Sequence, residues 1–174
     1  DLSGTITTVA GGGQSNPGDG ELAIRVRLST PKDIIVTDAG DIYIVVQNQH
    51  QVLKIDTSGI ITTVAGTGTA IFSGDGSLAT NAGLNRPTGI ALDPDGNLYV
   101  ADTGNKRIRK IPPSGTITTV AGGGTAGWPD YGSGGLATDA ELIGPNDVTL
   151  DDQGNLYIAD QSLIRKVDPS GTIT

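Results

Sequence analysis

Short apolar segments separated by turn residues recur along the whole chain, and they predict β-strands. In the central part, four segments of five or six residues can be distinguished: TGIALD from Thr88, NLYVAD from Asn97, RIRKI from Arg107 and TITTVA from Thr116. They are rich in Ile, Val, Leu, Tyr and Thr, which is typical of strands. The turn-forming stretches DPDG, DTGNK and PPSG lie between them, so neighbouring segments are expected to form antiparallel hairpins.

The same pattern occurs three times. SGTITTVAG at Ser3 returns at Ser58 as SGIITTVAG and at Ser114 as SGTITTVAG, and SGTIT begins again at Ser170, so the spacings are 55, 56 and 56 residues. Four antiparallel strands per repeat describe the blade of a β-propeller. The sequence therefore predicts an all-β propeller with three four-stranded blades. It forms a single domain, 1–174, with repeats at about 3–57, 58–113 and 114–169 and a partial fourth at 170–174.

Two local details follow from the alignment of the repeats. Glycines occupy one equivalent turn position, where a positive φ is unstrained; they are Gly40, Gly96 and Gly154. The long connections between blades contain GDGELAIRVRL, GDGSLATNAGL and GSGGLATDAEL. Leu78 and Ala82 are four residues apart, as are Leu136 and Ala140, so each pair would share one face if a short helix formed there; a loop is the other interpretation.

Composition and charge narrow the classes of function. The chain has 36% hydrophobic and 17% charged residues, which suits a folded domain with many turns. No apolar run is long enough to span a membrane, and the chain contains no signal-peptide pattern. The net charge of −8 argues against a nucleic-acid partner. Cysteine is absent, so disulfides and thiol chemistry are excluded.

GNLYVADTGNKRIRKI followed by SGTITTVAG resembles the NHL-repeat family of β-propellers, and the likeness extends over essentially the whole chain. The long repeat with FSGDGSLATNAGL is similar to bacterial secreted or surface members. The resemblance implies a six-bladed ring, a role in binding, and an extracellular or periplasmic location. The first repeat departs from the pattern, since it has Val46 where the other two have Asp102 and Asp160.

The repeat frame implies that the blades are shared between repeats. Each repeat begins with the outermost strand of one blade and ends with the third strand of the next, so residues 4–10 have no blade of their own. Three blades are too few to close a ring. We therefore expect two chains to form a six-bladed homodimer in which the strand Thr5 to Ala10 of one chain completes the third blade of the other. In that arrangement Thr172 to Thr174 would fray.

A binding face is predicted where the inter-blade connections and the hairpins between second and third strands meet. Tyr43, Tyr99 and Tyr157 are equivalent strand positions and are expected to be structural, whereas the other aromatic residues lie in the connections. Trp and Tyr are typical interface anchors, although capping of the sheets beneath their own loops is an alternative role. The candidate ligand-binding residues for a protein, peptide or glycan are Trp128, Tyr131, Phe72, Arg86, Asn105, Lys106 and His50.

The sequence contains few residues that could form a catalytic site. His50 is the only histidine, which excludes a multi-histidine zinc site within one chain. Asp102 and Asp160 are expected to accept hydrogen bonds from hairpin N–H groups. The primary hypothesis is thus a non-enzymatic binding and scaffold module without a cofactor. The alternative is a calcium-dependent enzyme of the lactonase or lyase type, with Asp33, Asn146 and Asp147 as oxygen ligands at the mouth of the channel.

Overall fold

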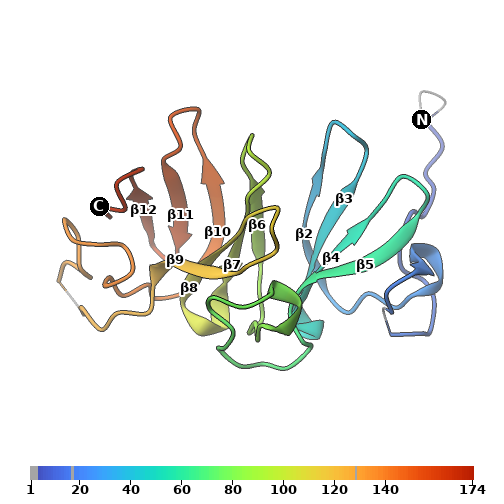
Figure 1. Ribbon diagram of the computed structural model, residues 1–174, viewed down its shortest axis with the longest axis horizontal. Coiled ribbons are helices and arrows are strands. Elements are labelled where there is room, and N and C mark those ends of the chain that lie inside the picture. Colours follow the sequence, from blue (N-terminus) through green and yellow to red (C-terminus); the bar gives the residue numbers. More distant parts are fainter. Residues whose placement is uncertain (1–3, 17, 128) are drawn as a thin grey trace.

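A computed structural model describes residues 4–16, 18–127 and 129–174, and it contains three antiparallel sheets that spread like a fan (Figure 1). Blade 1 contains β2 (Pro31–Val36), β3 (Ile42–Val46), β4 (Gln51–Ile55) and β5 (Ile60–Ala65). Blade 2 contains β6 (Gly89–Leu92), β7 (Leu98–Asp102), β8 (Arg107–Ile111) and β9 (Thr118–Gly122). Blade 3 contains β10 (Pro145–Leu150), β11 (Leu156–Asp160) and β12 (Leu163–Val167). The all-β class and the antiparallel blades are confirmed.

The expected hairpins form because the turn residues adopt the conformations that they favour. Gly40, Gly96 and Gly154 have φ of 88°, 81° and 79°, as predicted for the turn between first and second strands. The second strand pairs with the third so that Tyr99 lies opposite Lys110, and the lysine ammonium lies 5.4 Å from the centre of the ring. The other two tyrosines have equivalent lysine partners, which supports the structural role expected for all three.

The three blades differ in strand number. Blade 1 has five strands, because β1 (Glu21–Leu22) of the preceding connection pairs with β5. Blade 3 has three strands, and residues 172–174 return along β12: the N–H of Thr174 donates to the carbonyl of Lys166, and Ile173 is fully buried. The expected fraying of Thr172 to Thr174 concerns the two-chain ring; within the single chain these residues are hydrogen-bonded to the segment around β12. Ile173 is the equivalent of the buried Ile117. Its burial holds residues 172–174, the C-terminal stub, against the blade.

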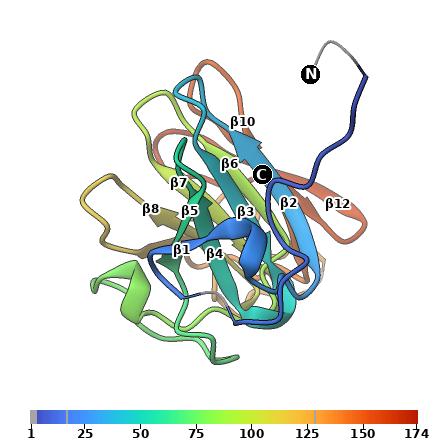
Figure 2. The same ribbon diagram turned by 90° about the vertical axis from the view of Figure 1, so that its right-hand side faces the viewer.

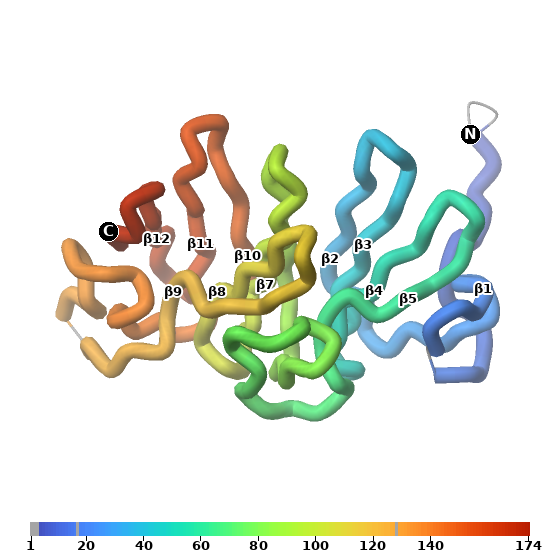
Figure 3. The backbone as a smooth tube through the Cα atoms, viewed as in Figure 1, coloured from blue at the N-terminus to red at the C-terminus, as the bar shows by residue number. Residues whose placement is uncertain are grey.

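Each connection covers the outer strand of the blade that follows it. The N–H groups of Gly76 and Ala79 donate to the carbonyls of Ile117 and Gly115, both at 2.8 Å. Equivalent bonds run from the segments 20–23 and 134–137 to the outer edges of blades 1 and 3. Figure 3 shows the connection between blades 1 and 2 (green) as a wide loop below the sheets, and the other two connections at the left and right ends of the fan. An exposed strand edge is prone to pairing with other chains, and the connection covers part of each edge.

The connections contain no α-helix in the described residues; they contain short 3₁₀ helices, of which η1 spans Ala23–Arg25 and η3 spans Ala79–Asn81. The helical alternative, in which Leu78 and Ala82 would share one apolar face, is not what forms, because a 3₁₀ turn repeats every three residues. Ala79 and Ala82 are therefore buried together, while Leu78 is 54% exposed. Two more 3₁₀ turns lie in the hairpins, η2 (Gln47–Gln49) and η4 (Thr103–Asn105). No described helix is long and apolar enough to cross a membrane.

The core lies between blades as much as within them. Val52 of blade 1 packs in one cluster with Ile90 of blade 2, and Ile108 of blade 2 packs in another with Val148 of blade 3. The innermost strands β2, β6 and β10 lie side by side near the middle of the fan (Figure 1). A third cluster fills blade 1 and its preceding connection.

Residues 4–9 form no strand, and Figure 2 shows the N-terminal segment extending away from blade 1. Ala10 is the first residue of this segment that packs against the core cluster of blade 1. Ile6 is 96% exposed, whereas the equivalent Ile61, Ile117 and Ile173 are buried. The same sequence therefore forms a packed outer strand only where the other strands of a blade are present beside it.

Candidate functional site

The predicted face does bring together parts of neighbouring blades, but its candidate residues are mostly engaged with the protein itself. His50 and Lys106 occupy equivalent left-handed positions at the ends of η2 and η4. The Nδ1 atom of His50 accepts a hydrogen bond from the backbone N–H of Arg86 at 3.0 Å. The ammonium of Lys106 lies 3.7 Å from the carboxylate of Glu141. Both side chains thus connect one blade to the connection that follows it.

Phe72 and Asn105 form a second group, on blade 2. The ring of Phe72 lies over two guanidinium groups, 3.8 Å from that of Arg107 and 4.9 Å from that of Arg109. The side-chain amide of Asn105 donates to the carbonyl of Ile71 and to the carboxylate of Asp102. Cation–π stacking of this kind fixes the ring against the sheet. Phe72 remains 42% exposed, so it caps the sheet and also contributes to the surface.

Beneath Phe72 lies a buried ionic network that sequence reasoning did not find. Arg109 is fully buried and donates from Nε and Nη2 to Asp75 Oδ1, at 3.1 and 2.6 Å, and from Nη1 to Asp102 Oδ2 at 3.3 Å. Thr119 donates its hydroxyl to the other oxygen of Asp75. Burial raises the pKa of the Asp102 carboxyl, against the opposing effect of hydrogen bonds from Asn85, Asn105 and Arg109.

The buried aspartates accept hydrogen bonds from the connections. Asp102 accepts from the N–H of Asn85, and Asp160 accepts from the N–H groups of Ile143 and Gly144. The expectation that hairpin N–H groups would be their partners is wrong in this respect. The donors belong to the chain just before each blade's first strand, so each aspartate fixes a blade to its own incoming connection.

Blade 3 lacks part of this network. Arg165 is the equivalent of Arg109, but Ser133 stands where blade 2 has Asp75. Arg165 is only 3% exposed; its Nη2 donates to Ser133 Oγ at 3.2 Å and its Nε to the carbonyl of Thr174 at 3.4 Å. Its Nη1 is buried and has no hydrogen-bond partner among the described residues.

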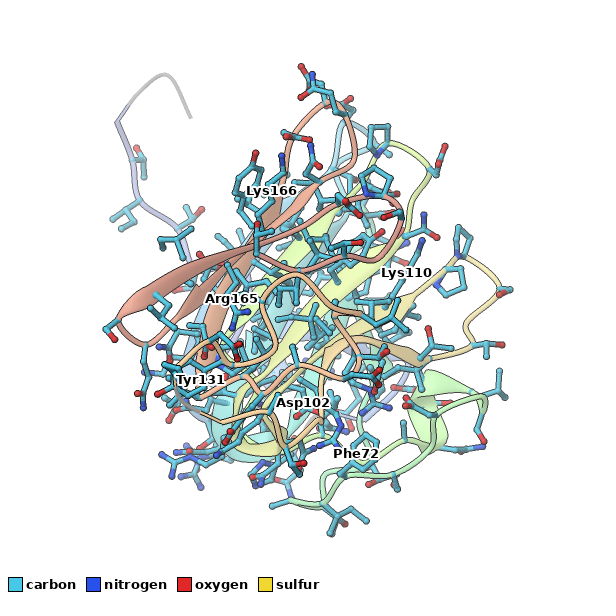
Figure 4. The ribbon with its side chains drawn as sticks, turned by 90° about the vertical axis from the view of Figure 1, so that its left-hand side faces the viewer. Phe72, Asp102, Lys110, Tyr131, Arg165 and Lys166 are labelled. Atoms are coloured by element: carbon cyan, nitrogen blue, oxygen red, sulfur yellow. The ribbon has the colours of Figure 1, made fainter. Side chains whose placement is uncertain are left out.

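A hollow of about 440 Å³ lies beside Arg165. It is lined by Pro129, Asp130, Tyr131, Ser133, Ile143, Ser162, Leu163, Ile164, Arg165 and Thr174. Among the described residues, Tyr131 is the one predicted ligand-binding residue that lines it, and Figure 4 shows Tyr131 and Arg165 on the same end of the molecule. Trp128 lies outside the described residues.

The three oxygen donors of the calcium alternative lie on the inner strands, and they take part in contacts within and between blades. Asp33 accepts from the N–H of Ile34 through one carboxylate oxygen and from the N–H of Ile90 on blade 2 through the other, both at 2.8 Å. Asp147 accepts from the N–H of Val148, and the carbonyl of Asn146 accepts from the hydroxyl of Thr88. Calcium binding would have to compete with these bonds.

Comparisons with known proteins agree with this architecture. Two family models match the chain: the NHL repeat over residues 84–111, and the teneurin NHL domain over residues 2–71 and 128–174. Teneurin-1 of Mus musculus is 36% identical over 104 residues, and teneurin-3 of Danio rerio is 40% identical over 97 residues. These matches cover 52% and 49% of the chain, but the chain spans only 4% of each teneurin.

Solved structures from Bacteroides are similar in fold and are six-bladed NHL-type propellers. An auxiliary nutrient binding protein from Bacteroides thetaiotaomicron superimposes with a TM-score of 0.63 at 28% identity, over 76% of this chain and 36% of that one. A protein of unknown function from the same species gives 0.61 at 30% identity, over 73% and 32%. The three blades thus correspond to part of a larger ring, and the chain belongs to the NHL-repeat propellers, in the family of the teneurin NHL domain.

Proposed function

We propose that this chain is a non-enzymatic binding and scaffold module that closes into a six-bladed ring with a second copy of itself. The ring would present the connections and the second-to-third-strand hairpins as a binding face for a protein, peptide or glycan. The nutrient-binding name of the Bacteroides neighbour supports a binding role for a propeller of this kind. The assembly is the part that the geometry supports best, and one observation carries it.

That observation is a pair of complementary apolar positions at the two open ends of the fan. Within the chain, Val52 packs with Ile90 and Ile108 packs with Val148, and all four are at most 4% exposed. The next pair in this series would be Ile164 on blade 3 and Ile34 on blade 1. They are 74% and 60% exposed. Ile164 of one chain would therefore meet Ile34 of the other, twice about a two-fold axis.

The N-terminal segment supports the same arrangement. The strand Thr5 to Ala10 has the sequence of an outer strand, and blade 3 has only residues 172–174 in that position. In the ring, the partner's Thr5 to Ala10 would displace this stub and bury Ile6. The longer strand would form more backbone hydrogen bonds with β12 than three residues can.

Light scattering across a range of concentrations tests the assembly. The expected mass is twice 17.6 kDa at high concentration, with dissociation on dilution. Ile164→Asp and Ile34→Asp should each give a monomer at all concentrations, because a charge would be buried between the chains. Leu78→Asp is the matched control, since Leu78 is 54% exposed on the outer rim of blade 2. A wild-type chain that is monomeric throughout would disprove the ring.

The calcium-dependent enzyme gives a different result in a separate experiment. Calcium would raise the melting temperature, and joint replacement of Asn146 and Asp147 by Ala would remove that rise. For the non-enzymatic module we expect the melting temperature to be the same with and without calcium.

A further inference from the structure

Asp-Gly sequences are chemically reactive, and this chain contains them at Asp19–Gly20, Asp75–Gly76 and Asp95–Gly96. The main-chain nitrogen of the glycine attacks the side-chain carboxyl carbon of the aspartate, and water leaves as a cyclic succinimide forms. Glycine has no Cβ to hinder this approach. Water then opens the ring at one of its two carbonyls, which gives either aspartate again or an isoaspartate whose main chain passes through the side-chain carbon. The carboxyl group must be free to rotate toward the next nitrogen.

Two of the three carboxylates are held in place by hydrogen bonds. One oxygen of Asp75 accepts from Nε and Nη2 of the buried Arg109, at 3.1 and 2.6 Å, and the other accepts from the hydroxyl of Thr119 at 2.7 Å. Asp19 accepts from the backbone N–H of Thr63 at 2.6 Å. These bonds must break before either carboxyl group can turn toward its glycine.

The nitrogens of the three glycines differ in a similar way. The N–H groups of Gly20 and Gly76 donate to carbonyls at the outer edges of blades 1 and 2, at 3.0 and 2.8 Å. Each nitrogen is therefore released only when a connection separates from its blade. The N–H of Gly96 instead donates to the carbonyl of Asp93 at 3.0 Å, within one turn. A bond of this kind opens by local motion and leaves the rest of the sheet intact.

Asp95 is exposed in the turn between β6 and β7. Its backbone N–H donates to Asp93 Oδ1 at 3.0 Å, but its carboxylate has no hydrogen-bond or ion-pair partner among the residues that the structure describes. In blades 1 and 3 the turn glycine follows Ala39 and Gln153, which have no carboxyl group for this reaction. The reactive arrangement is thus specific to blade 2.

We propose that Asp95 is a site of spontaneous isoaspartate formation in the folded chain, whereas the fold protects Asp19 and Asp75. Conversion adds one carbon to the main chain between Asp95 and Gly96. The hydrogen bonds from the N–H groups of Gly96 and Asn97 to Asp93 span this linkage. The modification therefore weakens the first hairpin of blade 2. All of these groups belong to one chain, so the proposal does not rest on ring assembly.

Mass spectrometry of the intact chain after incubation at neutral pH tests the proposal. Trypsin does not cut between Arg86 and Pro87, so one peptide, residues 55–106, contains both Asp75 and Asp95. Electron-transfer fragmentation of this peptide distinguishes isoaspartate from aspartate at each position. Isoaspartate should form at Asp95 at least about tenfold faster than at Asp75, because the charge-assisted bonds of Asp75 must first break. In urea both positions should convert at similar rates, which shows that the difference comes from the fold.

Two variants connect the modification with stability. Asp95→Ser removes the carboxyl group, so its melting temperature should stay constant during incubation while that of the wild type falls. Asp152→Ser is the matched control at an exposed position of the equivalent turn in blade 3, and it should age like the wild type. Equal rates at Asp75 and Asp95 in the folded chain would overturn the proposal. So would the absence of isoaspartate at Asp95 after a time in which the chain in urea has converted.

Discussion

At the scale of single residues, the repeats contain a natural comparison between a buried ionic network and an apolar one. Blade 2 has Asp102, Asn105 and Arg109, and blade 1 has Val46, Gln49 and Leu53 at the equivalent positions. Val46 and Leu53 are fully buried. In blade 1 the Gln49 side chain accepts from the N–H of Ser29, as Asp102 accepts from the N–H of Asn85 in blade 2. The three differences between the blades therefore compensate one another, because the charged pair is replaced by apolar residues and the hydrogen bond to the incoming connection is kept.

This comparison makes a quantitative prediction for blade 2. Arg109→Leu alone should lower the free energy of unfolding by about 3–5 kcal/mol, because it leaves Asp102 buried without its cation. The triple variant Asp102→Val, Asn105→Gln, Arg109→Leu should lose less than about half of that. Urea unfolding of both variants measures the difference. If the triple variant were less stable than the single one, the two networks would not be interchangeable.

The carboxylate of Asp168, in the turn before the C-terminal stub, should be the main cause of the pH dependence of stability in this region. A hydrogen bond from the Ser170 hydroxyl, aided by the N–H of Thr172, holds the pKa of Asp168 below its ordinary value. Because the folded-state pKa is lowered, its stabilising effect is present above about pH 4 and is lost as the pH falls through the folded value.

We therefore expect Asp168→Asn to be less stable than the wild type at neutral pH and to lose less stability on acidification. Melting temperatures between pH 2 and 6 would show this as a flatter profile. Asp152→Asn, at an exposed turn position of the same blade, is the control and should follow the wild-type profile. Parallel profiles for Asp168→Asn and the wild type would contradict the assignment.

At the scale of elements, the fate of a strand depends on its neighbours more than on its sequence. SGTIT occurs at residues 3–7, 114–118 and 170–174, and the first and last copies differ in the burial of their isoleucine: Ile6 is 96% exposed, whereas Ile173 is fully buried. The last copy follows β12 directly and folds back on it through a turn. Beside the first copy, the described residues contain no third strand of a preceding blade.

The monomeric chain should therefore respond very differently to the same substitution in the two copies. Ile173→Ala should cost about 2–5 kcal/mol of stability, as expected for a buried side chain. Ile6→Ala should change the stability of the monomer by less than about 0.5 kcal/mol. Chemical unfolding at low protein concentration measures both. In the two-chain ring, Ile6→Ala should instead weaken association, and a large effect on the dilute monomer would mean that residues 4–10 pack within one chain.

At the scale of the whole molecule, the repeated sequence pattern was sufficient to predict the fold class and the arrangement of strands in the blades. The strands, the turn glycines and the offset between repeats and blades were predicted, because each is repeated in register and leaves few alternatives. Contacts between side chains far apart in the sequence were not predictable. Nothing in the sequence near Phe72 shows that Arg107 and Arg109 lie beneath it, so the sequence left open whether this ring anchors a partner or caps its own sheet.

The sequence contains both positions that explain the loss of the ion pair in blade 3, but it does not show that they are in contact. Aligning GDG with GSG in the connections shows that Asp75 is replaced by Ser133, while RIRKI aligned with LIRKV shows that the second arginine is retained. The contact between these two positions is visible only in the folded structure. Once it is known for one repeat, the equivalent pair can be recognised in the sequence of the others.

The offset between repeat and blade has a consequence for how such proteins change in copy number. Each unit of 55 or 56 residues ends in a third strand and is followed by an outer strand, so every junction between units is the same hairpin, such as the turn at Asp56–Gly59. Duplication or deletion of one whole unit by recombination therefore recreates a junction that already exists. The number of blades can therefore change during evolution without a new type of connection between units.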